Sequence, residues 1–237
     1  MTSGHGHHDG RFPGLPAKLA IHWRTKSHSH TRLPLMTTAT SLIAANQHHA
    51  IFAFDSILSH LNDQTPPSPS FEEASTALFV TWKIQKGASD HPQLRGCIGV
   101  LEERQLTRAL YDYALTSAFR DSRFNPISMH EVPKLHCTVS LISCFEKDLT
   151  WESWEVGTHG IIIEFYDSSR RRYSATFLPE VAQEQGWSRE ETIEALVRKS
   201  GYNGRLDEGL KNAINLTRYQ SSTATMSYED YRSARGL

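Results

Sequence analysis

The almost wholly apolar run IIIEFY at residues 161–166 constrains the fold more than any other segment, because a strand with so few polar residues must be covered on both faces. A short turn at 167–171 separates it from a second strand-forming run at 172–177. Two strands joined by so short a turn pair as an antiparallel hairpin. The two runs therefore predict a sheet built from hairpins rather than from parallel crossovers.

Strand and helix patterns alternate along the rest of the chain. Strand-forming runs occupy 78–84, 94–101, 135–141 and 214–220, and helical periodicity or turn signals occupy 41–61, 104–119, 179–186, 188–200 and 208–213. Interleaved helices and strands that include hairpins favour an α+β fold, with a mixed, mainly antiparallel sheet flanked by helices. A chain of 237 residues can bury a sizeable core, and no internal repeat divides it.

The first 36 residues differ from the rest of the chain. They are rich in histidine, with scattered Gly, Pro and Ser, and they show no apolar periodicity. We expect a disordered polar, His-rich tail over 1–36 and a single domain over 37–237. The basic residues of the tail, with no acid after Asp9, also fit a mitochondrial presequence loosely, although an amphipathic face is missing. The histidines lack the fixed spacing of a zinc module, so no metal site is predicted.

Charge and cysteine usage narrow the protein class. The formal net charge is −1, so no long-range field steers the chain towards nucleic acid or anionic lipid. No apolar run approaches the roughly 18 residues needed to span a bilayer, and the N-terminus has no hydrophobic signal core. Three cysteines without CxxC spacing argue against a disulfide framework and indicate a reducing compartment. We therefore expect a soluble intracellular protein.

The segment LRGCIG at 94–99 is the most unusual strand in the chain. Gly96 and Gly99 weaken a strand, and such residues are tolerated at a bulge or where a ligand or another backbone approaches closely. Residues i and i+2 share one face of a strand, so Arg95 and Cys97 should project together. A guanidinium near a thiol favours the reactive thiolate. One interpretation is a thiol or anion-binding site, and the other is a buried structural cysteine beside a salt-bridged arginine.

Three further side chains are candidates for the same site. Asp121 and Arg123 follow the helix predicted after LRGCIG, where they can converge on that strand or simply cap a loop. His159 lies between two glycines just before the apolar strand. An imidazole in such a turn can act as an acid or a base, or it can hold the hydrogen bonds of the loop.

Four other reactive residues have simpler explanations. Glu180 near a helix N-terminus and Lys199 near a helix C-terminus match the charge preferences of helix ends. Cys137 and Cys144 lie on or near one strand and are expected in the core. The chain also lacks a P-loop, a GxSxG elbow and an HExxH helix, so the sequence indicates no particular cofactor.

Several segments together resemble the AMMECR domain family, and most closely its eukaryotic members. The matching blocks are LFVTW at 78–82, LRGCIG at 94–99, ALTSAFRDSRF at 114–124, WEVGTHGIIIEF at 154–165, ATFLPEVAQEQGW at 175–187 and LTRYQS at 216–221. The resemblance covers about residues 42–231. It implies an α+β fold whose larger and smaller lobes surround a cleft, with LRGCIG near that cleft. It also implies a cytoplasmic or nuclear location.

The resemblance implies no particular reaction. Prokaryotic relatives are often encoded beside a radical-SAM protein and a Memo-type protein, which implies a shared modification or redox pathway. One hypothesis is an enzyme or enzyme subunit. Its candidate groups are the Cys97 thiol, Asp121 and His159 as proton-handling groups, and Arg95, Gly96, Gly99 and Arg123 as residues that bind a small anionic ligand. The other hypothesis is a non-catalytic binding or scaffold protein whose cleft receives a protein partner.

Overall fold

The computed structural model of the protein describes residues 43–87 and 91–237, and the predicted tail at 1–36 lies outside these residues. The strands are β1 Ser75–Ile84, β2 Gln93–Gln105, β3 Leu135–Leu149, β4 Gly160–Tyr166, β5 Arg172–Phe177 and β6 Asn215–Ser227. They form one sheet in the order β2-β1-β3-β6-β4-β5, and every neighbouring pair among these strands is antiparallel. The predicted α+β class with a mainly antiparallel sheet is confirmed.

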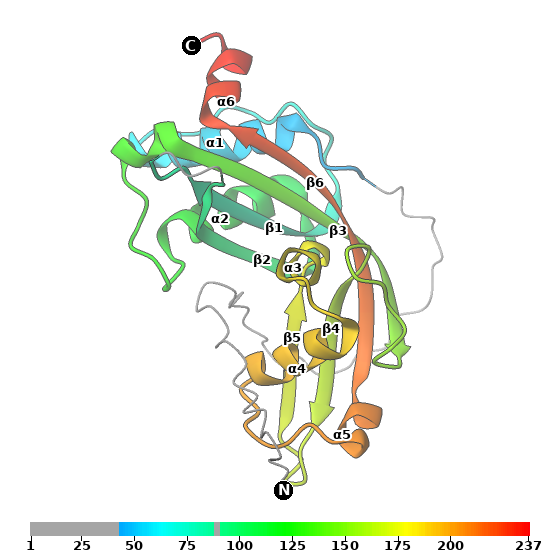
Figure 1. Cartoon of the computed structure of the whole chain (residues 1–237). Helices are drawn as coiled ribbons and strands as arrows, with labels where there is room; N and C mark the ends of the chain where they lie inside the picture. Colours follow the sequence, from blue (N-terminus) through cyan, green and yellow to red (C-terminus); the bar gives the residue numbers. More distant parts are fainter. Residues whose placement is uncertain (1–42, 88–90) are drawn as a thin grey trace, which may run out of the picture.

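Helices cover both ends of the curled sheet (Figure 1). They are α1 Gln47–Leu61, α2 Leu106–Phe119, the 3-10 helix η2 Met129–Lys134, α3 Pro179–Gln185, α4 Arg189–Lys199, α5 Glu208–Ala213 and α6 Tyr228–Arg235. We call the part with α1, α2, α6, β1 and β2 the upper lobe, and the part with β4, β5, α3, α4 and α5 the lower lobe. Strands β3 and β6 run through both lobes (Figure 1). No helix in the described part of the chain has the length and hydrophobicity needed to cross a membrane.

Each lobe has its own hydrophobic core, and β1 contributes to both. Side chains alternate between the two faces of a strand. On β1, Leu78 and Trp82 enter the upper core, whereas Phe79 enters the lower core. Cys97 on β2 also packs in the lower core. The strand that carries LRGCIG therefore lies where the two lobes meet.

Helix α1 begins later than its apolar periodicity predicts. The predicted N-cap Ser41 lies outside the described residues, and Asn46 caps the helix instead. The Asn46 side chain accepts a hydrogen bond from the His48 N–H at 3.0 Å, and His49 Nδ1 accepts one from the Asn46 N–H at 3.0 Å. Two free N–H groups at the helix start are thereby satisfied, which fixes its first turn at Gln47.

The C-terminal end of the chain contains more regular structure than the pattern predicts. Strand β6 continues to Ser227 because it stays paired with β3 as far as His136. Helix α6 then follows, with Ser227 accepting a hydrogen bond from the Asp230 N–H at 3.1 Å. Tyr231 on α6 donates its hydroxyl proton to Asp55 on α1 at 2.9 Å. This contact fastens the last helix to the first one.

Candidate functional site

Cys97 lies on the edge strand β2 at the junction of the two lobes. The residue is 5% exposed. Thr81 lies directly opposite on β1, and its Oγ1 donates a hydrogen bond to the Cys97 Sγ at 3.1 Å. Directly paired residues share one face of a sheet, so the register of β1 and β2 brings this hydroxyl to the thiol.

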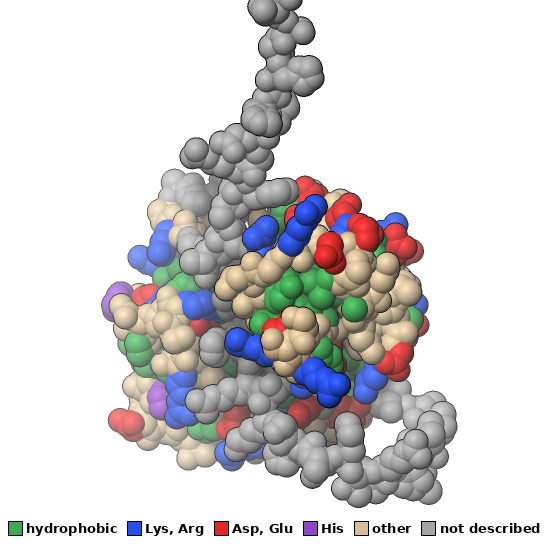
Figure 2. Space-filling view, turned by 90° about the horizontal axis from the view of Figure 1, so that it is seen from below, with side chains coloured by type: hydrophobic (Ala, Val, Ile, Leu, Met, Phe, Trp, Pro, Cys, Tyr) green, Lys and Arg blue, Asp and Glu red, His purple; other side chains and the backbone are tan. Residues whose placement is uncertain are grey.

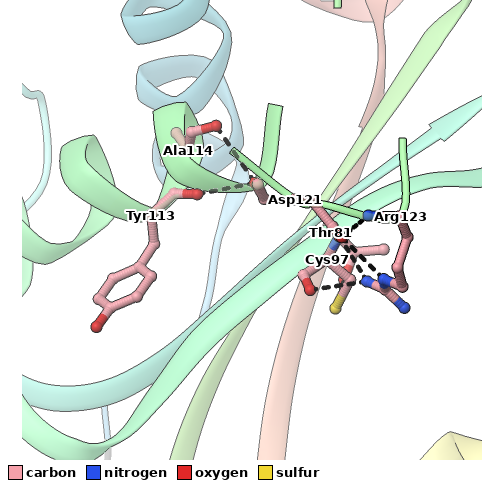
Figure 3. A network of polar contacts seen from close by, with 7 residues as sticks. Thr81, Cys97, Tyr113, Ala114, Asp121 and Arg123 are labelled. Carbon is pink, nitrogen blue, oxygen red and sulfur yellow. Dashed lines mark hydrogen bonds and ion pairs between the residues drawn. The ribbon is translucent and has the colours of Figure 1, made fainter. Parts of the chain in front are cut away.

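The loop after α2 covers the free edge of β2 at Cys97 (Figure 3). Asp121 Oδ2 accepts a hydrogen bond from the Cys97 backbone N–H at 2.9 Å, and Arg123 Nη2 donates one to the Cys97 carbonyl oxygen at 3.1 Å. Arg123 Nε also donates to Asp121 Oδ1 at 2.8 Å. An edge strand exposes unpaired backbone groups, and here a carboxylate and a guanidinium satisfy them. The structure therefore brings Asp121 and Arg123 to Cys97.

The charge state of Asp121 suits a positioning role. Burial raises the pKa of Asp121, but hydrogen bonds from Arg123 and from the Cys97 N–H outweigh burial and hold this pKa below its ordinary value. The carboxylate is therefore charged at neutral pH and its oxygens are engaged. Such a group holds the strand and the arginine in place, and it has no proton to donate.

Neighbouring parts of the protein pack closely against both glycines of LRGCIG. A Cβ atom at Gly96 would overlap the backbone carbonyl of Ser117 on α2. A Cβ atom at Gly99 would overlap the Leu78 carbonyl oxygen and the Phe79 ring on β1. Close approach of another backbone is one of the predicted reasons for glycine in this strand. This packing accounts for Gly96 and Gly99 without a ligand, and their ligand-binding role stays a prediction.

Arg95 interrupts the regular pairing of β2. The register between β1 and β2 shifts between Trp82 and Lys83, which leaves Arg95 as the extra residue of a β-bulge. Its guanidinium donates to Glu131, from Nε to Oε1 at 2.8 Å and from Nη2 to Oε2 at 3.1 Å. The bulge breaks the alternation from which we expected Arg95 and Cys97 to project together. Arg95 is instead committed to an ion pair with η2.

His159 lies on the other face of the sheet from the thiol. Its Nδ1 accepts a hydrogen bond from the Glu155 N–H at 3.1 Å, which closes the turn before β4. Its ring influences the charge of Glu146, and Glu146 pairs with Arg218 on β6. Arg218 and Tyr219 are neighbours on that strand, so their side chains point to opposite faces, and Tyr219 belongs to the core that contains the thiol. The structure thus groups His159 with a surface ion pair.

The other two cysteines have different environments. Cys137 on β3 is fully buried, as predicted, and burial raises its pKa far above the ordinary value. Cys144 is exposed, so the prediction of a core position is wrong for this residue. It lies where the register of β3 and β6 shifts, with a positive φ of 54°. The irregular pairing turns its side chain out of the core.

Lys199 was not among the predicted site residues, yet the structure places it near the thiol. It is the last residue of α4 and is half-buried. Its Nζ donates a hydrogen bond to the Thr176 carbonyl oxygen on β5 at 2.7 Å and lies 4.5 Å from the centre of the Phe177 ring. Burial lowers the pKa of Lys199 to about 7, while the nearby Cys97 acts against this shift and Arg123 adds to it. The lysine therefore shares its electrostatic environment with Cys97 and Arg123.

Glu180 is the second group that the sequence assigned only to a helix end. It lies in the first turn of α3 and is half-buried. Burial raises the pKa of Glu180, and the neighbouring Glu184 raises it further. Glu180 in turn raises the pKa of both Cys97 and Tyr219. The lower lobe thus supplies an amine, a carboxyl group and a phenol around the thiol.

The thiol of Cys97 is protonated at rest. Burial is the largest influence and raises the pKa of Cys97, as do two nearby carboxyl groups. The hydrogen bond from Thr81 and the charge of Arg123 lower it. Lys199, with a pKa of about 7, has a neutral amine in about half of the molecules at neutral pH. A thiol and a neutral amine are both nucleophiles, and either can exchange a proton with a bound ligand.

Metal binding has no support in this cluster. Within residues 43–87 and 91–237, no three His, Cys, Asp or Glu side chains are grouped so that they could hold a metal ion.

These observations define a class of protein: a two-lobed α+β domain on one curled antiparallel sheet, with a thiol and an amine at the lobe junction. The family model named AMMECR1 matches residues 50–224. The chain belongs to the AMMECR1 family, as its sequence blocks predicted.

Related proteins occur in plants, fungi and archaea. An uncharacterized protein of Arabidopsis thaliana is 50% identical over 194 residues, which cover 81% of this chain and 90% of that protein. An uncharacterized protein of Saccharomyces cerevisiae is 31% identical over 216 residues, covering 77% of this chain and 86% of that protein. The crystal structure of an uncharacterized protein from Pyrococcus horikoshii has a TM-score of 0.62 at 24% identity, covering 77% of this chain and 93% of that chain. This last likeness shows a common fold.

Proposed function

We propose that this chain is an enzyme or a subunit of an enzyme, with its reacting groups at the junction of the two lobes. The observation that carries the proposal is that Cys97 on β2 acts on the charge of Lys199 on α4 and raises its pKa, while Arg123 and Glu180 act on the thiol. Titratable groups with shifted pKa values gather at functional sites, because burial and charge tune their reactivity. The cleft implied by the family resemblance would place a ligand at this junction.

The side chains at the lobe junction take different roles from those that the sequence suggested. Cys97 and Lys199 contact the ligand, and Lys199 replaces His159 as the second reacting group. Asp121 and Arg123 hold β2 in position. Of the two candidate arginines, Arg123 is the one whose charge acts on the thiol, so it is the better placed for an anionic group of the ligand. A thiol served by an amine also fits the modification or redox pathway that the family resemblance implies.

We also propose one domain over 37–237 and a cytoplasmic or nuclear location. One sheet serves both cores, which supports a single domain. Free thiols at all three cysteines suit a reducing compartment. Basic and acidic side chains are interspersed around the apolar side chains on the face seen in Figure 2. This mixture of charges supports the proposal that nucleic acid is not a partner, because nucleic-acid binding uses a basic patch.

The enzyme proposal is tested by the change that the purified protein makes to a cell metabolite extract. We expect the wild-type chain to deplete one metabolite and to produce another, and we expect Cys97→Ser and Lys199→Met to abolish this change. The matched controls are Cys144→Ser and Lys147→Met, which alter exposed residues of β3 and should keep the change. Mass spectrometry of the extract reads the outcome. A wild-type chain that alters no metabolite, or control variants as inactive as the site variants, would contradict the proposal.

The alternative is a binding or scaffold protein, and one observation favours it. Neighbouring parts of the protein occupy the space beside Gly96 and Gly99, and Cys97 is 5% exposed. LRGCIG can therefore serve packing alone. In that case Cys97→Ser is silent in every functional assay. A pull-down then recovers one stoichiometric partner, which is lost when exposed residues at the junction are changed.

A further inference from the structure

We propose that Lys199 is the nucleophile of this site and that it forms an imine with the carbonyl carbon of a small aldehyde or ketone. This inference rests on the proposed function and deepens it, because it names the class of substrate and the covalent step.

The amine of Lys199 is directed away from its own helix end. A lysine in the last turn of a helix ordinarily serves the free carbonyl groups of that helix. Lys199 instead donates to the Thr176 carbonyl oxygen on β5 at 2.7 Å, and its Nζ lies 4.5 Å from the centre of the Phe177 ring. A backbone acceptor and an aromatic ring thus hold the amine in one place. Fixed placement of the attacking group is a large part of what an enzyme contributes to a bimolecular step.

The charges around Lys199 differ from those around Lys211. Lys211 is 8% exposed and forms ion pairs with Glu190 and Glu208. No acidic residue in the described part of the chain lies within ion-pair distance of Lys199. A partly buried ammonium without a counter-charge is costly, and a nearby guanidinium increases that cost.

This environment therefore makes the neutral amine far more populated at neutral pH than it is in an ordinary lysine. Burial and Arg123 lower the pKa of Lys199 to about 7, against the opposite influence of Cys97. The hydrogen bonds to Glu190 and Glu208 raise the pKa of Lys211. Of these two lysines, Lys199 is the one whose nitrogen has a free electron pair in about half of the molecules at neutral pH. Desolvation and a neighbouring cation are the two means by which proteins activate lysine for imine formation.

Imine formation at Lys199 needs no reactant other than the amine and the carbonyl compound. The Lys199 nitrogen attacks the carbonyl carbon, and a C–N bond forms while the C=O π electrons move to oxygen. The C–O bond then breaks, and the oxygen leaves as water together with the two protons that the amine carried. The product is an imine with a C=N bond between Lys199 and the substrate carbon, and no group is oxidised or reduced.

Borohydride trapping tests the inference on the whole chain. The protein is incubated with glyoxylate, which is anionic, or with acetaldehyde, which is neutral, and the imine is reduced with sodium borohydride. Peptide mass spectrometry then compares the labelling of Lys199 with that of the buried Lys211 and the exposed Lys147. We expect Lys199 to be labelled at least about tenfold faster than either at pH 7, since an ordinary lysine is almost wholly protonated there. Equal labelling of the three lysines overturns the inference.

The pH profile and one variant sharpen the test. Labelling of Lys199 should rise through pH 7 and level off above it. The charged or titratable groups that act on Lys199 are Cys97 on β2 and Arg123 in the loop after α2. Glu180 on α3 and Tyr219 on β6 act on that same thiol. Lys199→Met removes the amine without adding a charge, and it must lose the label at this position while its thermal unfolding midpoint stays near that of the wild type.

The trapping result separates this inference from the enzyme proposal. If Cys97→Ser and Lys199→Met abolish the metabolite change but no carbonyl compound is trapped on Lys199, the enzyme proposal stands and the imine is excluded. If Lys199 is trapped selectively while the extract shows no metabolite change, the imine chemistry stands and the enzyme proposal loses its support.

Discussion

Asp121 and Cys97 are far apart in the chain, yet the Asp121 carboxylate accepts the backbone N–H of Cys97 at 2.9 Å. The same carboxylate holds Arg123, and Arg123 donates to the Cys97 carbonyl oxygen at 3.1 Å. One acidic residue thereby fastens the loop after α2 to the strand that carries the thiol. The two backbone groups that an edge strand would leave open at this position are both satisfied.

Replacing Asp121 with asparagine should lower the free energy of unfolding by about 2–4 kcal/mol, because it leaves the mostly buried Arg123 without its charged partner. Urea unfolding at pH 7 measures the loss. Asp112→Asn breaks the exposed ion pair with Arg108 on α2 and serves as the matched control, with an expected loss below about 0.5 kcal/mol. Equal losses in the two variants would contradict the role given to Asp121.

Glu131 should make folding sensitive to acid. Burial raises the pKa of Glu131, but hydrogen bonds from Arg95 and from the Ser128 turn outweigh burial and lower it to about 2, from an ordinary value of 4.5. A lowered pKa in the folded state stabilises the protein above the unfolded pKa, and this stabilisation is lost as the pH falls from about 5 towards 2. Its full size is about 3 kcal/mol.

The variant Glu131→Gln tests that dependence. The wild type should exceed the variant in unfolding free energy by the largest margin at pH 6, and the margin should shrink steadily between pH 5 and pH 3. Urea unfolding at several pH values measures both proteins. A margin that does not change with pH would show that the ion pair between Arg95 and Glu131 is not the source.

The variant Gly96→Ala should destabilise the fold by about 1–3 kcal/mol, because the new methyl group meets the rigid Ser117 carbonyl of α2. Thermal unfolding followed by circular dichroism measures the effect. In Gly209→Ala on α5, the new methyl group meets only Asp207 Oδ1, at 3.4 Å. That control should be neutral or more stable by up to about 1 kcal/mol, since alanine favours a helix. A neutral Gly96→Ala would show that α2 can move away from β2.

The three cysteines should react with iodoacetamide in the order Cys144, Cys97, Cys137. Cys144 is exposed, Cys97 has a hydrogen bond from Thr81 that favours its thiolate, and Cys137 has burial alone acting on its pKa. Peptide mass spectrometry after timed quenching at neutral pH gives the three rates. Thr81→Val removes the donor and should slow the labelling of Cys97 several-fold without changing that of Cys144. Equal, slow labelling of Cys97 and Cys137 would count against a reactive thiol.

Much of the fold was predictable because its patterns are local. The apolar strand β4 and its turn into β5 predict a hairpin. The capping box at Ser188 and Glu191 predicts the start of α4. Helix α6 was missed although Ser227, Asp230 and Gly236 carry the signals of a helix start and end. Its stability depends on the contact of Tyr231 with α1, which no local pattern reveals.

The site was only partly predictable, because its members meet through long-range packing. Asp121 and Arg123 follow the helix that leads back to β2, so their return to Cys97 could be anticipated. The bulge at Arg95 depends on the register with β1, which a single strand does not encode. Lys199 comes within electrostatic reach of the thiol because α4 packs on β5. Its position at a helix end does not reveal that long-range packing.

Strand β6 places Leu216 and Tyr219 in the lower core and Met226 in the upper core. The two lobes therefore share one continuous main chain over 13 residues, hydrogen-bonded to β3 along most of its length. A domain hinge needs a short, weakly bonded connection, and this strand is the opposite of one. Any motion that admits a molecule to Cys97 and Lys199 must consequently arise in the peripheral loops and helices, while the paired strands β3 and β6 stay rigid.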